Sequence, residues 1–187
     1  AFANELSLVC DRLGINVREL IRLANHHPRV NVLQPGCGVG GHCIAVDPWF
    51  IAAEAPDCTP LIQTARRVND GKSRWVIEQV QARAAALEDQ LGRPALIGCL
   101  GLAFKPNVDD LRESPALHIT TELLMAGLDV LACEPHLHEH PTIKLHSLEQ
   151  VLADADLLVF LVAHTPFRYL NLAGRNVFDL CGVTEPT

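Results

Sequence analysis

A regular alternation of apolar runs and helical stretches fills the second half of the chain. Helical patterns that open at Ser114-Pro115 and at Ser147 separate the runs, while Gly101 and Gly127 mark the end of a run and of a helix. Uninterrupted apolar runs are typical of strands buried on both faces of a parallel sheet. Strands that alternate with helices predict a doubly wound α/β domain with right-handed crossovers. The predicted strands cover residues 95–100, 129–133, 156–163 and 175–180.

The first half of the chain is helical in pattern. Apolar residues recur at helical spacing over residues 2–13, 17–25 and 60–91. Gly71 interrupts the last pattern without ending it, and a helix of that length is typical of a scaffold or a subunit interface. Residues 92–94, Gly-Arg-Pro, then break the helix. We therefore expect an all-helical segment over residues 1–92 and a parallel-sheet α/β domain over residues 93–187.

A shorter helix is expected after Asp47. Aspartate is a favourable N-cap, and proline suits the first helical position, which Pro48 would occupy. The next three residues, Trp49, Phe50 and Ile51, are large and apolar, so we expect them to form the buried face of this helix.

A glycine-rich loop over residues 36–48 reads Gly-Cys-Gly-Val-Gly-Gly-His-Cys-Ile-Ala-Val-Asp-Pro. Four glycines within six positions let the backbone approach another group closely. The loop then presents a thiol at Cys43 and a carboxylate at Asp47. Because a thiolate adds readily to a carbonyl carbon and a carboxylate can transfer protons, one interpretation is a nucleophile with an acid–base partner. An unreactive buried cysteine is the alternative.

Metal binding is a rival interpretation of the same loop, because Cys37, His42, Cys43 and Asp47 offer ligand atoms. However, the adjacent ligands at positions 42 and 43 make a poor chelate, and no second pair completes a tetrahedral site. Three alternating histidines within residues 136–140 are framed by prolines, which favours an exposed loop. We therefore expect no metal.

Two cations follow the first predicted strand. Lys105 lies in the segment after Gly101, and Arg112 lies just before the next predicted helix. Both are expected beside the crevice at the carboxyl ends of the strands, where α/β sheets bind ligands and phosphates. The segment does not match the Gly-x-Gly-x-x-Gly dinucleotide fingerprint. A charged surface turn is an equally open interpretation.

Charge and cysteine content limit the classes of partner. A net charge of −7 disfavours non-specific binding to nucleic acid, which requires a basic face. Seven cysteines without a Cys-x-x-Cys pair favour a reduced, cytoplasmic setting. No apolar run is long enough to cross a bilayer, so we expect neither nucleic acid nor a membrane as a partner. The chain opens directly in a helical pattern without a capping residue, as a fragment of a longer protein would.

Three segments together resemble a known family. The glycine-rich loop, residues 101–106 (Gly-Leu-Ala-Phe-Lys-Pro) and residues 110–115 (Asp-Leu-Arg-Glu-Ser-Pro) are similar to the UDP-glucose/GDP-mannose dehydrogenases, and the resemblance covers essentially the whole chain. It implies an N-terminal Rossmann domain for NAD, a central helical dimerisation segment and a C-terminal Rossmann-like domain for the UDP-sugar. The chain would begin inside the central segment and be inactive on its own.

The resemblance also implies a reaction, the four-electron oxidation of a sugar C6 alcohol to a carboxylate with two NAD+. Cys43 would capture the aldehyde as a thiohemiacetal, and a second hydride transfer would give a thioester that water hydrolyses. Asp47 would assist proton transfer and position the water. The helix over residues 60–91 would form a homodimer.

The resemblance further implies the residues that contact ligands. His27 and Arg29 would be offered to the site of a neighbouring subunit. A dehydrogenase for another UDP-sugar or for GDP-mannose remains open, as does a module that only binds a nucleotide-sugar and dimerises. The expected substrate contacts are His27, Arg29, Gly40, Phe104, Lys105 and Arg175, and the expected NAD contact is Arg112.

Overall fold

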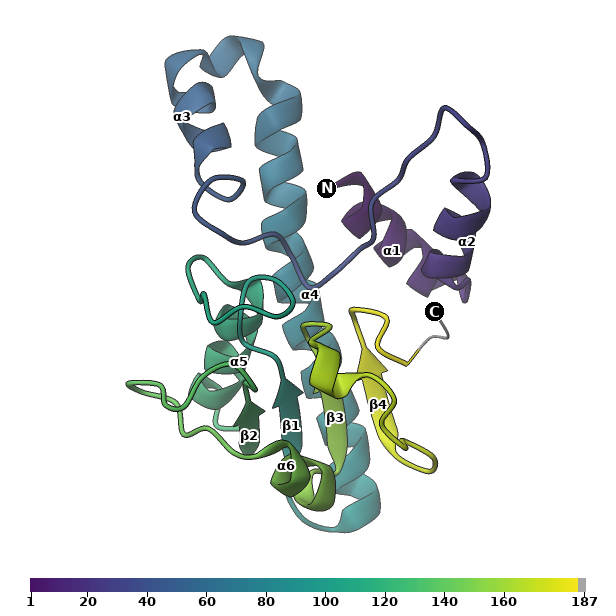
Figure 1. The fold of residues 1–187 in the computed structure, drawn as a ribbon, viewed down its shortest axis with the longest axis vertical. Coiled ribbons are helices and arrows are strands. Elements are labelled where there is room, and N and C mark those ends of the chain that lie inside the picture. Colours follow the sequence, from purple (N-terminus) through teal and green to yellow (C-terminus); the bar gives the residue numbers. More distant parts are fainter. Residues whose placement is uncertain (185–187) are drawn as a thin grey trace.

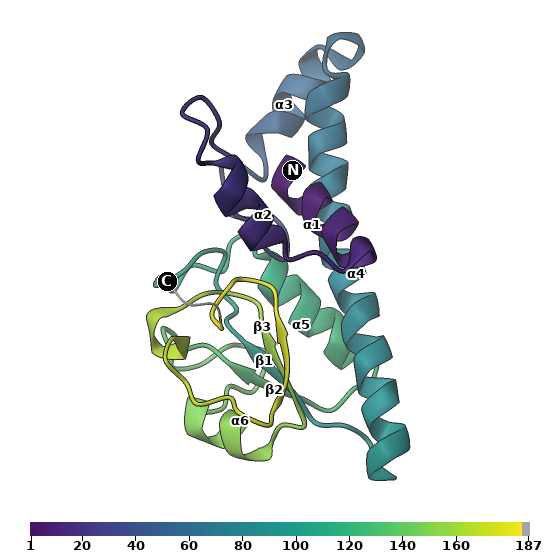
Figure 2. The same cartoon turned by 90° about the vertical axis from the view of Figure 1, so that its right-hand side faces the viewer.

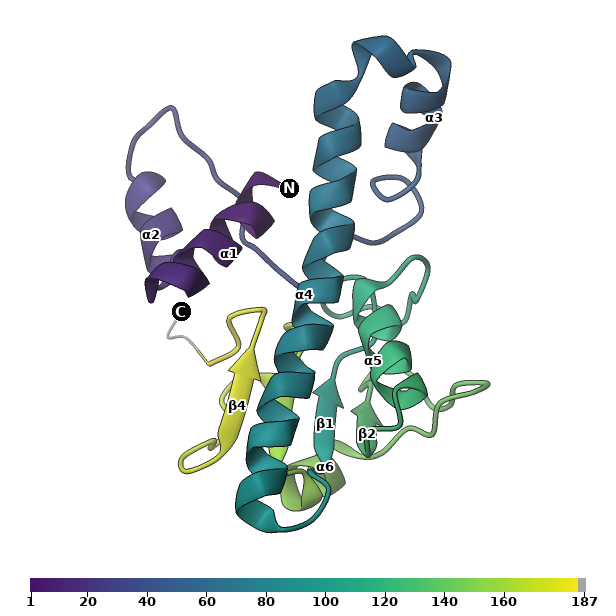
Figure 3. The same ribbon diagram turned by 180° about the vertical axis from the view of Figure 1, so that it is seen from behind.

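The computed structural model describes residues 1–184 and shows helices and a parallel sheet arranged along one long helix (Figure 1). Seen from behind, α1 and the sheet lie along the same long helix at different heights, and α2 packs on α1 (Figure 3). The helices are α1 (Phe2–Leu13), α2 (Val17–Ala24), α3 (Asp47–Glu54), α4 (Pro60–Leu91), α5 (Pro115–Met125) and α6 (Leu148–Asp154), with short 3-10 turns η1 (Pro56–Cys58) and η2 (Thr165–Phe167). The strands are β1 (Ile97–Leu100), β2 (Val130–Cys133), β3 (Leu157–Phe160) and β4 (Asn176–Asp179).

The four strands are parallel and lie in the order β2-β1-β3-β4. Ile97 of β1 is level with Val130 of β2 and with Leu157 of β3, so the carboxyl ends of the strands share one edge. Helices α4 and α5 cover one face of the sheet, and α6 covers the other (Figure 2). The predicted doubly wound α/β fold is confirmed. The chain direction around the sheet reverses between β1 and β3, which is where such folds form a ligand crevice.

Helix α4 has 32 residues and is about 48 Å long, as the pattern over residues 60–91 predicts. In its second half, Val76, Val80 and Ala84 are buried in the same hydrophobic cluster as Ile97 and Val159 of the sheet. The helix therefore belongs both to the helical part and to the core of the α/β part. Within residues 1–184, no helix is both long and apolar enough to cross a bilayer.

The prediction for α3 is wrong in two respects. The helix begins at Asp47 itself, so the N-cap position is Val46 and the Asp47 side chain makes no capping hydrogen bond. Trp49, Phe50 and Ile51 are 41%, 68% and 53% exposed instead of buried. The helix packs mainly on α4 and η1, and Ala52 is its one buried residue.

Strand β3 is shorter than the apolar run that predicts it. The run continues to residue 163, but the strand ends at Phe160. The N–H groups of Leu161 and Val162 both donate to the Leu100 carbonyl, at 2.9 and 3.3 Å, so the chain leaves the ladder there. This departure opens the space beyond the ends of β1 and β3.

Candidate active site

The glycine-rich loop is tied to the helical part through buried polar side chains. The Gly36 N–H donates to Asn4 Oδ1 at 2.9 Å, and Asn4 Nδ2 donates to Asn69 Oδ1 at 2.9 Å. One residue later, the Cys37 carbonyl accepts a hydrogen bond from Ser73 Oγ at 2.9 Å. Helices α1 and α4 supply these partners, so they hold this end of the loop through its backbone.

The next part of the loop lies against the α/β part with no room for side chains. The Gly41 N–H donates to the Arg112 carbonyl at 3.0 Å, and a Cβ at Gly41 would lie 3.0 Å from the Phe104 ring. At Gly40, a Cβ would lie 2.4 Å from the Glu113 carbonyl oxygen. The absence of a Cβ at both positions therefore permits a close backbone approach to the segment between β1 and α5.

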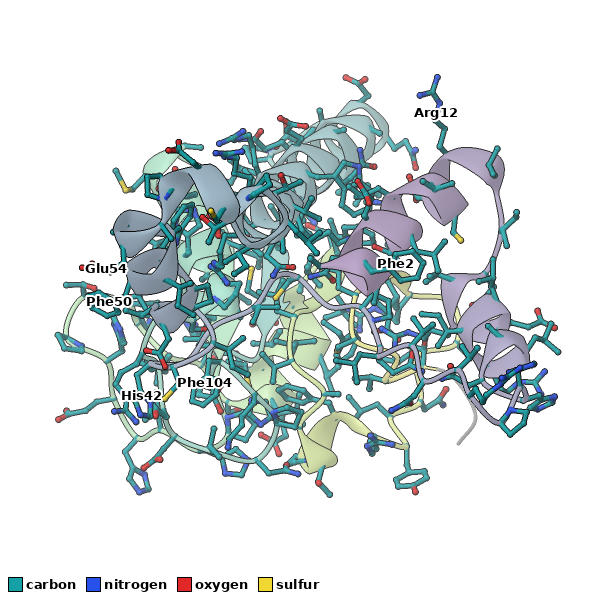
Figure 4. All side chains as sticks on the ribbon, turned by 90° about the horizontal axis from the view of Figure 1, so that it is seen from above. Phe2, Arg12, His42, Phe50, Glu54 and Phe104 are labelled. Atoms are coloured by element: carbon teal, nitrogen blue, oxygen red, sulfur yellow. The ribbon has the colours of Figure 1, made fainter. Side chains whose placement is uncertain are left out.

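Cys43 ends the loop, in the turn that leads into α3, and its side chain is exposed. Its carbonyl accepts hydrogen bonds from the N–H groups of Val46 and Asp47, at 3.1 and 2.8 Å. Cys43 and Asp47 are thus about one helical turn apart, and both are accessible to solvent. In the view from above, His42 and Phe104 lie on the same side of the molecule, near α3 (Figure 4).

An exposed cation borders Cys43 on the side of the α/β part. The Arg112 guanidinium donates to both carboxylate oxygens of Asp110, from Nε at 3.0 Å and from Nη2 at 2.5 Å. Hydrogen bonds from the side chain and the N–H of Arg112 lower the pKa of Asp110 to about 2. The pKa of Arg112 is raised, mainly by Asp110 and to a smaller extent by the neighbouring Cys43. Arg112 is therefore within electrostatic range of the thiol.

A cavity of about 260 Å³ lies at the carboxyl ends of β1 and β3, where the glycine-rich loop meets the sheet. Phe104 and Lys105 line it, with Lys105 Nζ 5.3 Å from the centroid of the Phe104 ring. Gly101 turns the chain out of β1 with φ of 92°, so close to β3 that a Cβ would lie 2.6 Å from Val162 Cβ. The cavity walls are residues 34–38, 103–106, 115–116, 161–163 and Cys181.

Four of the six predicted substrate contacts, His27, Arg29, Gly40 and Arg175, do not line this cavity within one chain. His27 and Arg29 are exposed, and the segment after α2 that carries them lies on the side of the molecule away from α3 (Figure 1). Arg175 precedes β4, so it lies at the amino ends of the strands, opposite the cavity. Its guanidinium donates hydrogen bonds to the carbonyls of Leu152 and Ala155, at the end of α6. Arg175 therefore does not reach this cavity within one chain, and its contact with the nucleotide-sugar stays a prediction.

A buried polar pair that was not predicted from the sequence, Glu134 and His164, lies next to the cavity. The Glu134 Oε2 atom accepts hydrogen bonds from the N–H groups of Leu102 and Ala103, at 2.7 and 3.0 Å, and lies 3.0 Å from His164 Nε2. Both side chains are fully buried. The signal in the sequence was a polar residue soon after each of two apolar strands, at the edge where parallel sheets bind ligands.

The cysteines of the loop differ in environment. Cys37 is buried, and its thiol lies 3.6 Å from the Leu161 carbonyl oxygen, to which it donates. Burial raises the pKa of Cys37 to about 12, so this thiol stays protonated at neutral pH. Within the part of the chain that the structure describes, no three His, Cys, Asp or Glu side chains are arranged to hold a metal ion. Cys43 is therefore the accessible sulfur of this loop.

The chain matches two models of one family and several known relatives. Residues 1–71 match the model of the UDP-glucose/GDP-mannose dehydrogenase family, central domain, and residues 98–186 match that of its UDP binding domain. The UDP-N-acetyl-D-mannosamine dehydrogenase of Escherichia coli (strain K12) is 56% identical, over 95% of this chain and 44% of its own length. The NDP-N-acetyl-D-galactosaminuronic acid dehydrogenase of Ralstonia nicotianae is 49% identical, over 98% of this chain and 44% of its own length.

A solved structure extends the similarity to the fold. The UDP-N-acetyl-mannosamine dehydrogenase of S. aureus superposes with a TM-score of 0.84 at 37% identity, covering 100% of this chain and 44% of that protein. The chain thus spans less than half the length of the relatives it matches. The two family models, the relatives and the shared fold agree, and the chain belongs to the UDP-glucose/GDP-mannose dehydrogenase family.

Proposed function

We propose that this chain supplies the catalytic thiol and the UDP-sugar site of an NAD-dependent UDP-N-acetyl-D-mannosamine 6-dehydrogenase. The observation that carries the proposal is the contact between the glycine-rich loop, which ends at Cys43, and the segment that carries Phe104, Lys105 and Arg112. The E. coli and S. aureus relatives, which are named for this activity, support the choice of sugar.

The cavity offers groups suited to a nucleotide-sugar. The exposed Lys105 ammonium can pair with a diphosphate, and the Phe104 ring beside it supplies an apolar surface for a sugar or base. The missing side chain of Gly40 makes room for Glu113, Pro115 and Phe104, so we assign Gly40 a sugar contact through its backbone groups alone. The match of residues 98–186 to a UDP binding domain supports UDP as the nucleotide.

Cys43 is the residue to which we assign covalent catalysis. Two molecules of NAD+, bound one after the other, would each accept one of the two hydrides that leave the sugar C6 carbon as the alcohol becomes an acid. The Cys43 thiolate adds to the aldehyde carbon, and a proton on the former carbonyl oxygen completes a thiohemiacetal. Removal of the second hydride leaves a thioester on Cys43. Water then attacks the thioester carbon, the C–S bond breaks, and the carboxylate is released with the thiol restored.

Two charged groups flank this chemistry. We assign Asp47 to proton transfer and to the orientation of the attacking water, because its carboxylate is exposed one helical turn from Cys43. Of the described residues, Arg112 suits an NAD contact, since its guanidinium is exposed beside Cys43 and such a group pairs well with phosphate. Arg112 would then contact NAD from the same segment that carries the substrate contacts Phe104 and Lys105.

We assign the remaining contacts to an assembly of two chains. The exposed apolar side chains near the start of α4, including Trp49, Phe50 and Leu61, suit an interface, which supports a homodimer through α4. In it, His27 and Arg29 would reach the partner's substrate. We also propose that residues 1–92 form the dimerisation segment and residues 93–187 the UDP-sugar domain, and that the protein is cytoplasmic, where its free cysteines stay reduced.

A second candidate keeps the same site and changes only the sugar nucleotide. The Ralstonia relative, 49% identical, is named for a different amino sugar, so other sugar nucleotides remain candidates. Calorimetric titration of the chain with UDP, UDP-N-acetylmannosamine and GDP separates them. We expect UDP and UDP-N-acetylmannosamine to bind and GDP not to bind, and tight binding of GDP alone would overturn the proposal.

A matched pair of lysine variants tests the cavity itself. Lys105→Ala should weaken UDP binding about tenfold, because it removes a charge-assisted contact to phosphate. Lys144→Ala removes an exposed lysine that does not line the cavity, so it should leave UDP binding unchanged. Equal affinities of the two variants would place the UDP site elsewhere.

A further inference from the structure

The proposed reaction leaves one buried ionisable pair unused, Glu134 after β2 and His164 after β3. Their side chains are completely buried, although a buried carboxylate is costly unless hydrogen bonds replace its water. Glu134 Oε2 accepts from the N–H groups of Leu102 and Ala103, and Oε1 accepts from the His136 N–H at 3.1 Å. Because hydrogen bonds from the backbone occupy both Glu134 oxygens and the pair lies close to the cavity, it is suited to fixing the shape of the cavity.

The contacts define the protonation state of the pair. The Asn107 N–H donates to His164 Nδ1 at 2.9 Å, so Nδ1 carries no proton. The proton of the neutral imidazole is therefore on Nε2, which donates to Glu134 Oε2 at 3.0 Å. Burial alone would raise the pKa of Glu134, but hydrogen bonds from His164 and from the Leu102 N–H outweigh it and lower this pKa. Glu134 is thus an ionised acceptor of backbone N–H groups.

The backbone groups held by the pair bracket the cavity segment. Leu102 and Ala103, bound by Glu134, come directly before Phe104 and Lys105, while Asn107, bound by His164, comes directly after Pro106. Asn107 has a positive φ of 60°, a conformation that asparagine tolerates, and its Oδ1 accepts from the Thr165 N–H at 2.8 Å. The segment is therefore clamped at both ends to groups that follow β2 and β3.

We propose that Glu134 and His164 are positioning residues that clamp residues 102–107 and thereby set Lys105 against the phosphates of the nucleotide-sugar. They touch no ligand and act through the backbone on either side of Phe104 and Lys105. The statement about phosphates rests on the proposed function, whereas the clamp itself can be tested without any ligand.

Two substitutions of His164 separate the halves of the clamp. Glutamine places an amide near Nε2 and can still donate to Glu134, but it does not reach the Asn107 N–H. Asparagine places its oxygen near Nδ1 and keeps the Asn107 contact, but it loses Glu134. Amide hydrogen exchange of the chain should therefore accelerate about tenfold or more at Asn107 in His164→Gln, and at Leu102 and Ala103 in His164→Asn.

A control keeps this test specific. His138→Ala removes an exposed histidine from the loop after β2 and should leave exchange at all three amides unchanged. Unchanged exchange at Leu102, Ala103 and Asn107 in both His164 variants would overturn the clamp. Equal acceleration across the whole sheet would also overturn it, because it would indicate general destabilisation.

A double-mutant cycle then links the clamp to the ligand. His164→Gln should weaken UDP binding about tenfold in the parent chain, and by less than about twofold in the Lys105→Ala background. A purely structural defect would lower the fraction of chain that binds and leave the dissociation constant unchanged. Equal effects in both backgrounds would refute action through Lys105. If the parent chain binds no UDP, the proposed function fails, and the exchange pattern still decides the clamp.

Discussion

Gly40→Ala tests the contact between the Cys43 loop and the α/β part most directly. A Cβ at this position would lie 2.4 Å from the Glu113 carbonyl oxygen, 2.8 Å from Pro115 Cδ and 3.0 Å from Phe104 Cβ. Real Cβ atoms do not approach other atoms within 3.0 Å, so loop and segment must separate by at least about 0.6 Å, the difference between 3.0 and 2.4 Å. The nearest atom belongs to the backbone, so no rotamer change relieves the clash.

The expected cost follows from overpacking against a rigid backbone, about 1–3 kcal/mol of the free energy of unfolding. Separation of the two surfaces also stretches the hydrogen bond from the Gly41 N–H to the Arg112 carbonyl, now 3.0 Å. We therefore expect lower stability together with weaker UDP binding, since the cavity lies between the same surfaces.

Urea unfolding with linear extrapolation measures the first effect and calorimetry the second. Gly71→Ala is the matched control, because a Cβ there meets nothing within 4 Å. In the interior of α4, alanine should stabilise the chain by about 0.5–1 kcal/mol. If Gly40→Ala is as stable as the parent chain, the close approach of loop and segment does not exist as described.

Three further changes have defined outcomes. Cys43→Ser should leave the affinity for UDP, measured by calorimetry, within about twofold of the parent, because the thiol acts on the sugar carbon. In the whole enzyme the same change should abolish turnover, and retained turnover would exclude the covalent route. Burial lowers the pKa of Lys72 from 10.5 to about 8. Between about pH 8 and 10.5 the unfolded state therefore binds more protons than the folded state, and the free energy of unfolding should rise with pH. Lys72→Met should remove that rise when urea unfolding is measured across this pH range. Ser114→Ala should lower the free energy of unfolding by about 1–2 kcal/mol, since Ser114 caps α5 and its Oγ also donates to the Leu102 carbonyl at 2.7 Å. Ser147→Ala, which removes an exposed cap without such a second contact, should cost less. Equal losses would show that the Ser114–Leu102 hydrogen bond does not contribute to stability.

The order of helices and strands could be predicted because local pattern and global fold agree. The alternation after residue 94 permits a parallel sheet and little else, and the pattern over residues 60–91 is long enough to outweigh Gly71. The buried face of α3 could not be predicted, since an apolar run does not say which neighbours cover it. Trp49 and Phe50 would be core residues in another setting, but here α4 and η1 are the main packing neighbours of their helix and leave both side chains exposed.

The candidate site could be predicted where its residues lie close together in the sequence. The glycine-rich loop and the segment from Gly101 to Arg112 carry most of the expected residues, and the structure brings them into contact. Arg175 lies at the end of β4 opposite the cavity, because the last strand begins at Asn176, and residue type alone does not predict where a strand begins. Glu134 and His164 are 30 residues apart and meet only because β2 and β3 both end at the same edge.

Helix α4 has a mechanical consequence for the cavity. Ser73 holds the glycine-rich loop directly and Asn69 holds it through Asn4, while Val76 and Val80, within about three turns of Asn69, belong to the core under the sheet. One continuous helix thus carries both walls, and it leaves no hinge between them. Opening and closing of the cavity by rotation of one wall against the other would require bending this helix. The cavity is therefore preformed, and admission of a ligand must depend on movement of shorter segments at its rim.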